Sequence, residues 1–167
     1  VLLGDNAASK LYVRNKRRTT EATGMRSYAY DLPATASQDE LLLLIEMLNH
    51  DPAVNGILVQ LPLPKHIDSA KVLNSIDPDK DVDGFHPVNV GKLSIGERTL
   101  TACTPVGSVI LAKSVLPSLS GLEAVVIGRS NIVGKPMAHL LLQAHATVKI
   151  CHSRTVDLER HTLDADI

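Results

Sequence analysis

The chain has 167 residues, of which 44% are hydrophobic, with two cysteines, only four aromatic residues and no tryptophan. A chain of this length can bury a sizeable core, which must be built from Leu, Ile, Val and Ala because aromatic side chains are so few. The net charge of -1 excludes the basic surface typical of proteins that bind nucleic acids or anionic membranes. The sequence contains no apolar run of membrane length and no visible targeting segment, so we expect a cytoplasmic protein with reduced cysteines.

Strand-like and helix-like segments alternate along the first hundred residues. In chain order, the predicted elements are a helix capped by Ser9 and ended by Gly24, an alternating run at Met25–Leu32, a helix at Leu41–Leu48 opened by a capping box at Ser37–Glu40, a buried strand at Gly56–Leu61, a helix at Asp68–Ile76 and a polar loop at Asp77–Val90. A loop of that length in a compact domain is often functional.

The rest of the chain continues the alternation. A helix is predicted at Pro105–Leu116, followed by a strand that runs into a glycine turn and a helix at Val125–Pro136, and by a second strand at Ala146–Cys151. This order predicts an α/β fold with parallel, helix-covered sheets. We expect two parallel-sheet α/β domains, residues 1–104 for substrate and 105–167 as a Rossmann-type unit. Both are expected to be incomplete, because the chain opens on the tail of a strand and stops where another would begin.

The stretch V-V-I-G-R-S-N-I-V-G-K-P at Val125–Pro136 suggests a dinucleotide site, because a glycine turn before a helix points N–H groups at an anion. It matches neither G-x-G-x-x-G nor a P-loop, which would need Ser or Thr where Pro136 stands. Arg129 follows the first glycine, and the next strand is followed by H-S-R-T with no carboxylate before Asp157, which favours NADP over NAD. Solvated surface arginines and a purely structural connector remain the alternatives.

Three polar features of the first part need explanation. Tyr12 and Lys16 are spaced i, i+4 and share one helix face, although a basic run such as this one is usually a solvated face. Gln60 is an amide at the carboxyl end of an apolar strand, which is where ligands bind in parallel sheets. Asp83 precedes a glycine, so it is either a turn former or a ligand anchor. The seven histidines and two cysteines show no metal-ligand spacing, so no metal is expected.

Five motifs, in order and in register, resemble one family. They are Y-V-R-N-K at Tyr12–Lys16, V-Q-L-P-L-P at Val59–Pro64, D-K-D-V-D-G at Asp79–Gly84, C-T-P at Cys103–Pro105 and G-R-S-N-I-V-G-K-P at Gly128–Pro136. Together they resemble the bifunctional methylenetetrahydrofolate dehydrogenase/methenyltetrahydrofolate cyclohydrolase family. The resemblance covers a middle portion of the family's chain. It implies NADP-dependent oxidation of 5,10-methylenetetrahydrofolate to the 5,10-methenyl form, hydrolysis to 10-formyltetrahydrofolate, and a homodimer.

The resemblance also implies a role for particular residues. Those implied for the folate and its chemistry are Lys16 as the central catalytic residue, Tyr12 stacking beside the substrate, Gln60 orienting Lys16, Asp83 holding the pterin ring, and Pro105. Those implied for NADP are Gly128, Arg129, Ser130, Ile132, Ser153 and Arg154. Three rival interpretations stay open: a different NADP-dependent oxidoreductase of the two-domain amino-acid dehydrogenase type, an inactive truncated chain, and a dehydrogenase without cyclohydrolase activity, against which the presence of both Lys16 and Gln60 argues.

Overall fold

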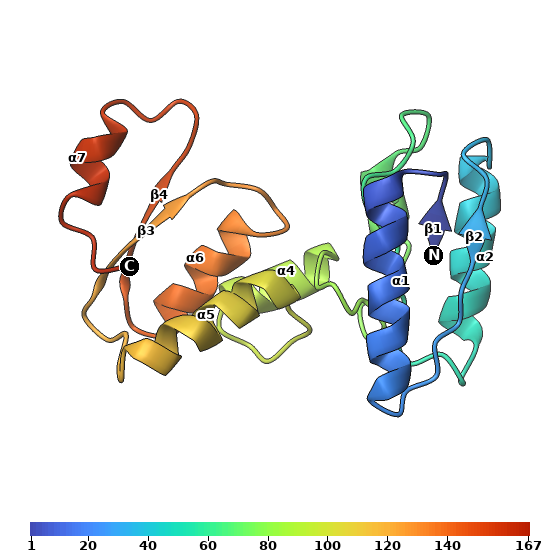
Figure 1. The fold of residues 1–167 in the computed structure, drawn as a ribbon, viewed down its shortest axis with the longest axis horizontal. Helices are drawn as coiled ribbons and strands as arrows, with labels where there is room; N and C mark the ends of the chain where they lie inside the picture. Colours follow the sequence, from blue (N-terminus) through green and yellow to red (C-terminus); the bar gives the residue numbers. More distant parts are fainter. The chain divides into compact units, whose positions relative to one another are not determined.

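The computed structural model describes residues 1–167 apart from the side chain of Ala8, and the chain forms two compact units, Val1–Asp81 and Val82–Ile167 (Figure 1). Each unit has its own aliphatic core and its own parallel strand pair. The α/β class with parallel pairing is therefore as predicted. The boundary that the sequence places near Thr104 stays a prediction.

The first unit is a small parallel sheet with helices on it. Its elements are β1 (Leu2–Leu3), α1 (Ala7–Ala22), β2 (Asp31–Leu32), α2 (Gln38–His50) and α3 (Ser69–Asn74). Strands β1 and β2 pair in parallel, with Leu2 opposite Asp31 and Leu3 opposite Leu32.

On the other side of β1, the Gln60 N–H donates to the Val1 carbonyl at 2.9 Å, and Ile57 forms a parallel bridge with Asp81. The predicted strand at Gly56–Leu61 is thus an extended segment with a single bridge rather than a full strand. Pro62 follows it and has no N–H to continue a ladder.

The helix ends of this unit follow from local side chains. The Asn6 side chain accepts the Ser9 N–H at 3.0 Å, so Asn6 caps α1 and the predicted cap at Ser9 is wrong by three residues. Ser9 is itself buried, inside the first turn of the helix. Gly24, with φ of +82°, follows the end of α1, which confirms the predicted stop. Ser37 accepts the Glu40 N–H at 3.1 Å and caps α2, also as predicted.

The core of the first unit lies between α2, α3 and the strands. Its fully or nearly fully buried members include Leu3, Leu41, Ile45, Ile57, Val59, Val72 and Ile76. Since these side chains come from β1, α2, α3 and the segment before Gln60, the core fixes α2 and that extended segment in one arrangement.

The second unit is a β–α–β arrangement with further helices. Its elements are α4 (Pro87–Ser94), α5 (Cys103–Val115), β3 (Glu123–Ile127), α6 (Gly134–Gln143), β4 (Thr147–Cys151) and α7 (Leu158–Thr162). Strands β3 and β4 pair in parallel from Glu123 opposite Thr147 to Ile127 opposite Cys151. The Val125 N–H donates to the Ile167 carbonyl at 2.8 Å on the other side of β3. The core here is made of Leu119, Ala124, Leu141 and Ala146.

Two helices of this unit were not predicted. Helix α4 begins inside the segment expected to be a loop, because the His86 ring nitrogen Nδ1 accepts the Val88 N–H at 3.2 Å and Pro87 suits the first turn. Helix α7 begins after Asp157, which has a left-handed φ of +51°. Helix α5 is close to its predicted range but starts two residues earlier, at Cys103.

Candidate functional site

The turn between β3 and α6 depends on two glycines. Gly128, with φ of +133°, leaves the end of β3, and its N–H donates to the Cys151 carbonyl at 2.7 Å. A Cβ atom on Gly134 would lie 2.7 Å from the Gly128 carbonyl carbon and 3.0 Å from the Arg129 nitrogen. Backbone atoms cannot give way there, so the close approach of α6 to the turn requires glycine at residue 134.

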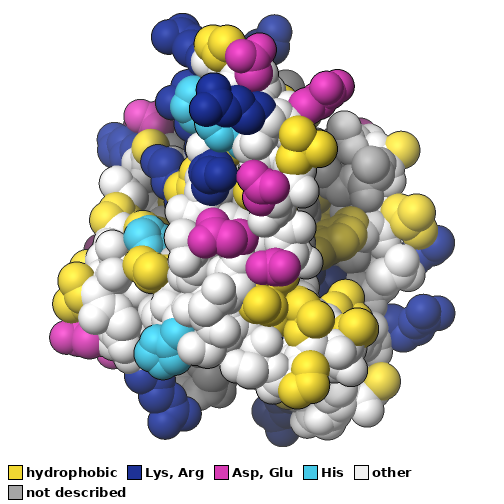
Figure 2. Space-filling model, turned by 90° about the vertical axis from the view of Figure 1, so that its left-hand side faces the viewer, with side chains coloured by type: hydrophobic (Ala, Val, Ile, Leu, Met, Phe, Trp, Pro, Cys, Tyr) yellow, Lys and Arg dark blue, Asp and Glu magenta, His cyan; other side chains and the backbone are white. Residues whose placement is uncertain are grey.

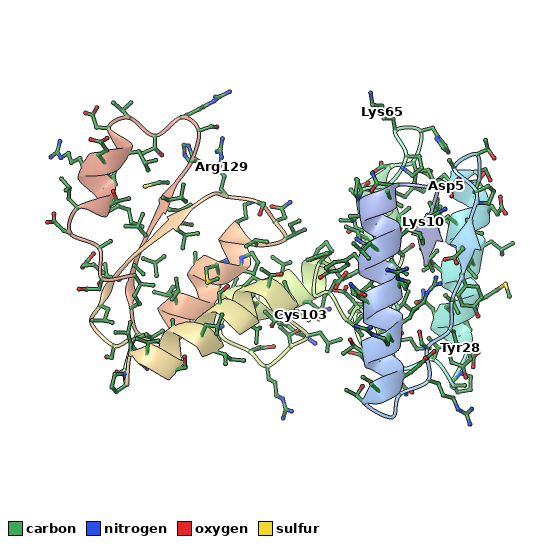
Figure 3. The ribbon with its side chains drawn as sticks, in the orientation of Figure 1. Asp5, Lys10, Tyr28, Lys65, Cys103 and Arg129 are labelled. Atoms are coloured by element: carbon green, nitrogen blue, oxygen red, sulfur yellow. The ribbon has the colours of Figure 1, made fainter. Side chains whose placement is uncertain are left out.

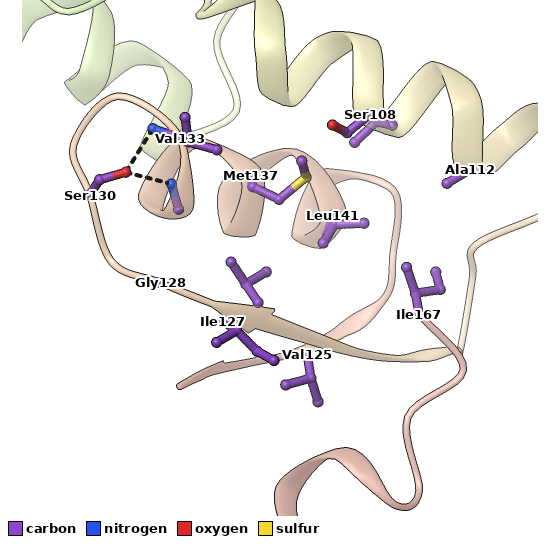
Figure 4. A pocket seen from close by; sticks show the side chains of 13 residues that line it. Ser108, Ala112, Val125, Ile127, Gly128, Ser130, Val133, Met137, Leu141 and Ile167 are labelled. Atoms are coloured by element: carbon purple, nitrogen blue, oxygen red, sulfur yellow. Dashed lines mark hydrogen bonds between the residues drawn. The ribbon is translucent and has the colours of Figure 1, made fainter. Parts of the chain in front are cut away.

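Ser130 closes this turn. Its Oγ accepts the N–H groups of Val133 at 3.1 Å and Gly134 at 3.2 Å, shown as dashed lines in Figure 4. Because the oxygen accepts twice, the hydroxyl proton is left to donate outward. Arg129 and Ile132 are exposed, and Figure 3 shows Arg129 beside the turn with its side chain extending outward. The turn therefore offers a hydroxyl donor, a guanidinium and a helix N-terminus to an anion.

A second polar turn follows β4 at the same edge of the sheet, because the Gly128–Cys151 hydrogen bond joins the two strand ends. Ser153 and Arg154 are its exposed central residues. Figure 2 faces this side of the molecule and shows Lys, Arg and His side chains near the top, with Asp and Glu side chains among them. This edge of the sheet is suited to a ligand with more than one negative charge.

A pocket of about 360 Å³ lies between α5, β3 and α6 (Figure 4). Its walls are mainly apolar, with Val109, Val126, Met137 and Leu141 among them. None of the lining residues carries an ionisable side chain. Phosphate groups are therefore expected at the polar turns rather than inside this pocket.

In the first unit, α1 brings Tyr12 and Lys16 together. The Lys16 Nζ atom lies 4.9 Å from the centroid of the Tyr12 ring, which is a cation–π distance. Tyr12 is 59% exposed and Lys16 is half-buried. The contact confirms that the i, i+4 spacing puts the two side chains within reach, and it leaves one face of the tyrosine ring for another flat group.

Gln60 is held by a hydrogen bond from its Nε2 to the Leu61 carbonyl at 2.8 Å. Its Oε1 is buried and has no hydrogen-bond partner among the described residues. An unpaired buried acceptor costs about 1–3 kcal/mol, so it marks a place where a donor is expected to bind. A lysine ammonium or a ligand N–H group would satisfy it.

The loop that carries Asp83 belongs to the second unit. Gly84 has φ of +65°, and a Cβ on it would lie 2.7 Å from the Leu100 carbonyl oxygen and 2.8 Å from the Thr101 Cα. The loop is thus pressed against the irregular segment that leads into α5. Asp83 is half-buried, whereas Pro105 is fully buried in the first turn of α5. A substrate contact by either residue stays a prediction.

Sequence reasoning missed the part that Lys80 plays. Its Nζ donates to the carbonyls of Leu48, Asn49 and Asp51 at 2.9, 2.6 and 2.8 Å, so it caps the carboxyl end of α2. The Lys80 carbonyl also accepts the Ile57 N–H at 2.7 Å. The position of Lys80 between two aspartates in D-K-D-V-D-G suggests a specific role for this lysine. The sequence does not reveal its partners, however, because they lie about thirty residues away in the chain.

The basic run on α1 is partly explained by an ion pair. Arg17 donates to both carboxylate oxygens of Asp31, at 3.2 and 2.5 Å. The hydrogen bond from this guanidinium lowers the pKa of the Asp31 carboxyl below its ordinary value, against a smaller opposing effect of burial. Arg17 is therefore a structural residue and is distinct from the Tyr12–Lys16 pair.

The described residues contain no group of three or more His, Cys, Asp or Glu side chains placed to hold a metal ion. Within the same residues, none of the helices has the length and apolar character needed to cross a bilayer.

Comparison with known proteins agrees with both units. The profile for the tetrahydrofolate dehydrogenase/cyclohydrolase catalytic domain matches residues 1–83, and that for the NAD(P)-binding domain of the same enzymes matches residues 102–167. The bifunctional protein FolD of Paramagnetospirillum magneticum is 60% identical over the whole chain, which spans 57% of that relative's length.

Two solved structures are also similar. The bifunctional enzyme FolD of Campylobacter jejuni is 52% identical with a TM-score of 0.96, over 99% of this chain and 59% of that one. The Trypanosoma brucei enzyme, complexed with NADP cofactor and an inhibitor, is 38% identical with a TM-score of 0.93, over 99% of this chain and 57% of that one. The predicted family is confirmed: the chain belongs to the tetrahydrofolate dehydrogenase/cyclohydrolase family.

Proposed function

We propose that the intact protein oxidises 5,10-methylenetetrahydrofolate with NADP and hydrolyses the resulting methenyl compound to 10-formyltetrahydrofolate. The observation that carries the proposal is the contact of Lys16 with Tyr12 on α1, in a chain that belongs to this family. An ammonium group over an aromatic ring supplies both a proton-transfer group and a flat surface for a pterin.

The two polar turns of the second unit fit NADP. Gly128 and Gly134 let the backbone approach a pyrophosphate, and the Ser130 hydroxyl is free to donate to it. Arg129, Ser153 and Arg154 would hold the 2′-phosphate, while exposed Ile132 would pack against the cofactor. NADP, when bound, supplies the hydride acceptor, so the residues around it need only to hold the two reacting carbons in contact.

The hydrolysis needs proton transfers. Lys16 in its neutral form would remove a proton from the attacking water, and the nearby cationic methenyl group favours that neutral form. Gln60 is proposed to orient Lys16, since its buried Oε1 lacks a donor and an amine N–H would provide one. Asp83 would accept hydrogen bonds from the pterin amino and ring N–H groups, with Pro105 lining the same substrate site.

The division of labour between residues 1–104 and 105–167 is part of the proposal. The first would hold the folate, apart from the contact proposed for Pro105, and the second would hold the dinucleotide. The extents of the two family matches support it. The homodimer and the cytoplasmic location are likewise proposed, and sedimentation and cell fractionation would test them.

A pair of variants tests the role of Lys16. We expect Lys16→Ala in the intact protein to lose cyclohydrolase activity on preformed methenyltetrahydrofolate by at least about a hundredfold, as removal of a general base does. Arg14→Ala removes an exposed cation from the same helix and should leave the rate unchanged. Equal rates for Lys16→Ala and the parent protein would refute the catalytic role.

A further inference from the structure

The turn after β4 is closed by hydrogen bonds between its first and last residues. The Thr155 N–H donates to the His152 carbonyl at 2.8 Å, and the His152 N–H donates to the Thr155 Oγ1 at 2.8 Å. The Arg154 N–H donates to the His152 Nδ1 at 3.2 Å. Three N–H groups of this four-residue turn are thus satisfied within it, two of them by side-chain atoms.

This arrangement determines what the turn presents to a ligand. Ser153 and Arg154 occupy the two central positions, and both are exposed. Within the part of the chain that the structure describes, no carboxylate forms a salt bridge with Arg154. The backbone that carries these side chains is therefore fixed before any ligand arrives, while the side chains themselves are available. Such preorganisation favours binding because less freedom is lost when the complex forms.

We propose that Thr155 is a positioning residue for cofactor selection. Its hydroxyl oxygen fixes the turn in the conformation that directs Ser153 and Arg154 at the 2′-phosphate of NADP, without touching the phosphate. The inference rests on the proposed function, since it deepens the account of the same dinucleotide site. Part of the preference for NADP over NAD is thus assigned to Thr155, a residue that does not itself contact the 2′-phosphate.

Thr155 is the side chain whose removal isolates this effect. The His152 N–H is partly buried, so the loss of its acceptor leaves an unpaired donor and the turn relaxes toward water. Valine has nearly the shape of threonine but no acceptor oxygen, whereas serine keeps the oxygen. The two substitutions therefore separate the hydrogen bond from the volume of the side chain.

The test is titration of the intact parent protein, Thr155→Val and Thr155→Ser with NADP and, separately, with NAD, with melting temperatures measured alongside. We expect Thr155→Val to raise the dissociation constant for NADP about tenfold and that for NAD less than about twofold, because only NADP carries the 2′-phosphate. Thr155→Ser should stay within about twofold of the parent protein for both cofactors.

The outcomes separate this inference from the proposed function. A Thr155→Val protein that binds NADP like the parent, or loses NADP and NAD equally, overturns the positioning role and leaves the proposed function standing. Failure of Thr155→Ser to retain NADP affinity also overturns it. A parent protein with no preference for NADP over NAD overturns the proposed cofactor and this inference together. Retention of NAD binding by Thr155→Val shows that the second unit, which carries Thr155, is folded.

Discussion

The replacement of Gly134 by alanine is expected to push a methyl group into backbone that cannot move aside. The added Cβ would lie 2.7 Å from the Gly128 carbonyl carbon and 3.0 Å from the Arg129 nitrogen. Since non-bonded carbon contacts are favourable at about 3.5–4.0 Å, the turn would have to retreat by roughly 1 Å. Overpacking of this kind costs about 1–3 kcal/mol.

Little is gained in return. Gly134 is the first residue of α6, where the better helix propensity of alanine returns less than about 1 kcal/mol. We therefore expect Gly134→Ala to lower the free energy of unfolding by about 1–2 kcal/mol. Because the displaced turn also carries Arg129 and Ser130, we expect the dissociation constant for NADP to rise by at least about tenfold.

Urea unfolding followed by circular dichroism, with NADP titration, measures both effects. The matched control is Gly107→Ala in α5, where an added Cβ meets nothing within 4 Å. The free energy of unfolding of this control should rise by about 0.5–1 kcal/mol, and its dissociation constant for NADP should stay the same as that of the parent protein. A Gly134→Ala protein that is as stable as the parent and binds NADP equally well would refute the close-approach argument.

Three further substitutions have expected outcomes, each measured by urea unfolding. Lys80→Met should lower the free energy of unfolding by about 1–3 kcal/mol, because three carbonyls at the end of α2 lose their donor. A loss of less than about 0.5 kcal/mol, as for an ordinary surface substitution, would contradict the capping role. Asp31→Asn should cost less than about 1 kcal/mol at pH 7, because its ion pair with Arg17 is exposed. The pKa of Asp31 is lower in the folded protein than in the unfolded chain, so its ion pair stabilises the fold at pH values above the unfolded pKa. This stabilisation should disappear as the pH falls through the folded pKa. A loss of stability in Asp31→Asn that does not depend on pH would refute this role of the ion pair. Gln60→Met should change stability by less than about 1 kcal/mol, since the loss of one hydrogen bond is offset by removal of an unpaired buried oxygen, yet it should lower turnover.

Local signals in the sequence were sufficient where the structure depends on neighbouring residues. The cap at Ser37, the stop at Gly24 and the parallel strands around the Gly128 turn were all predictable, because each depends on residues within a few positions. Helix α4 was missed for a related reason: Pro87 in a segment rich in Asp and Pro indicates a loop, although proline is equally at home in a first helical turn.

The rest depended on contacts between distant parts of the chain. Lys80 meets carbonyls about thirty residues away, and no local pattern contains that information. The need for glycine at residue 134 comes from the path of the turn rather than from a standard fingerprint. The unpaired oxygen of Gln60 could be suspected from an amide in an apolar strand, but only the structure shows which of its two ends has a partner.

The most direct test of the central claim is a spectrophotometric assay of the intact protein with 5,10-methylenetetrahydrofolate and either NADP or NAD, with NADPH and the methenyl compound followed separately. We predict that the parent protein turns over the folate faster with NADP than with NAD and converts the methenyl compound to 10-formyltetrahydrofolate. In Lys16→Ala, any methenyl compound that is formed should accumulate. Cofactor binding with no turnover of the folate, or hydrolysis that proceeds equally well in Lys16→Ala, would contradict the account.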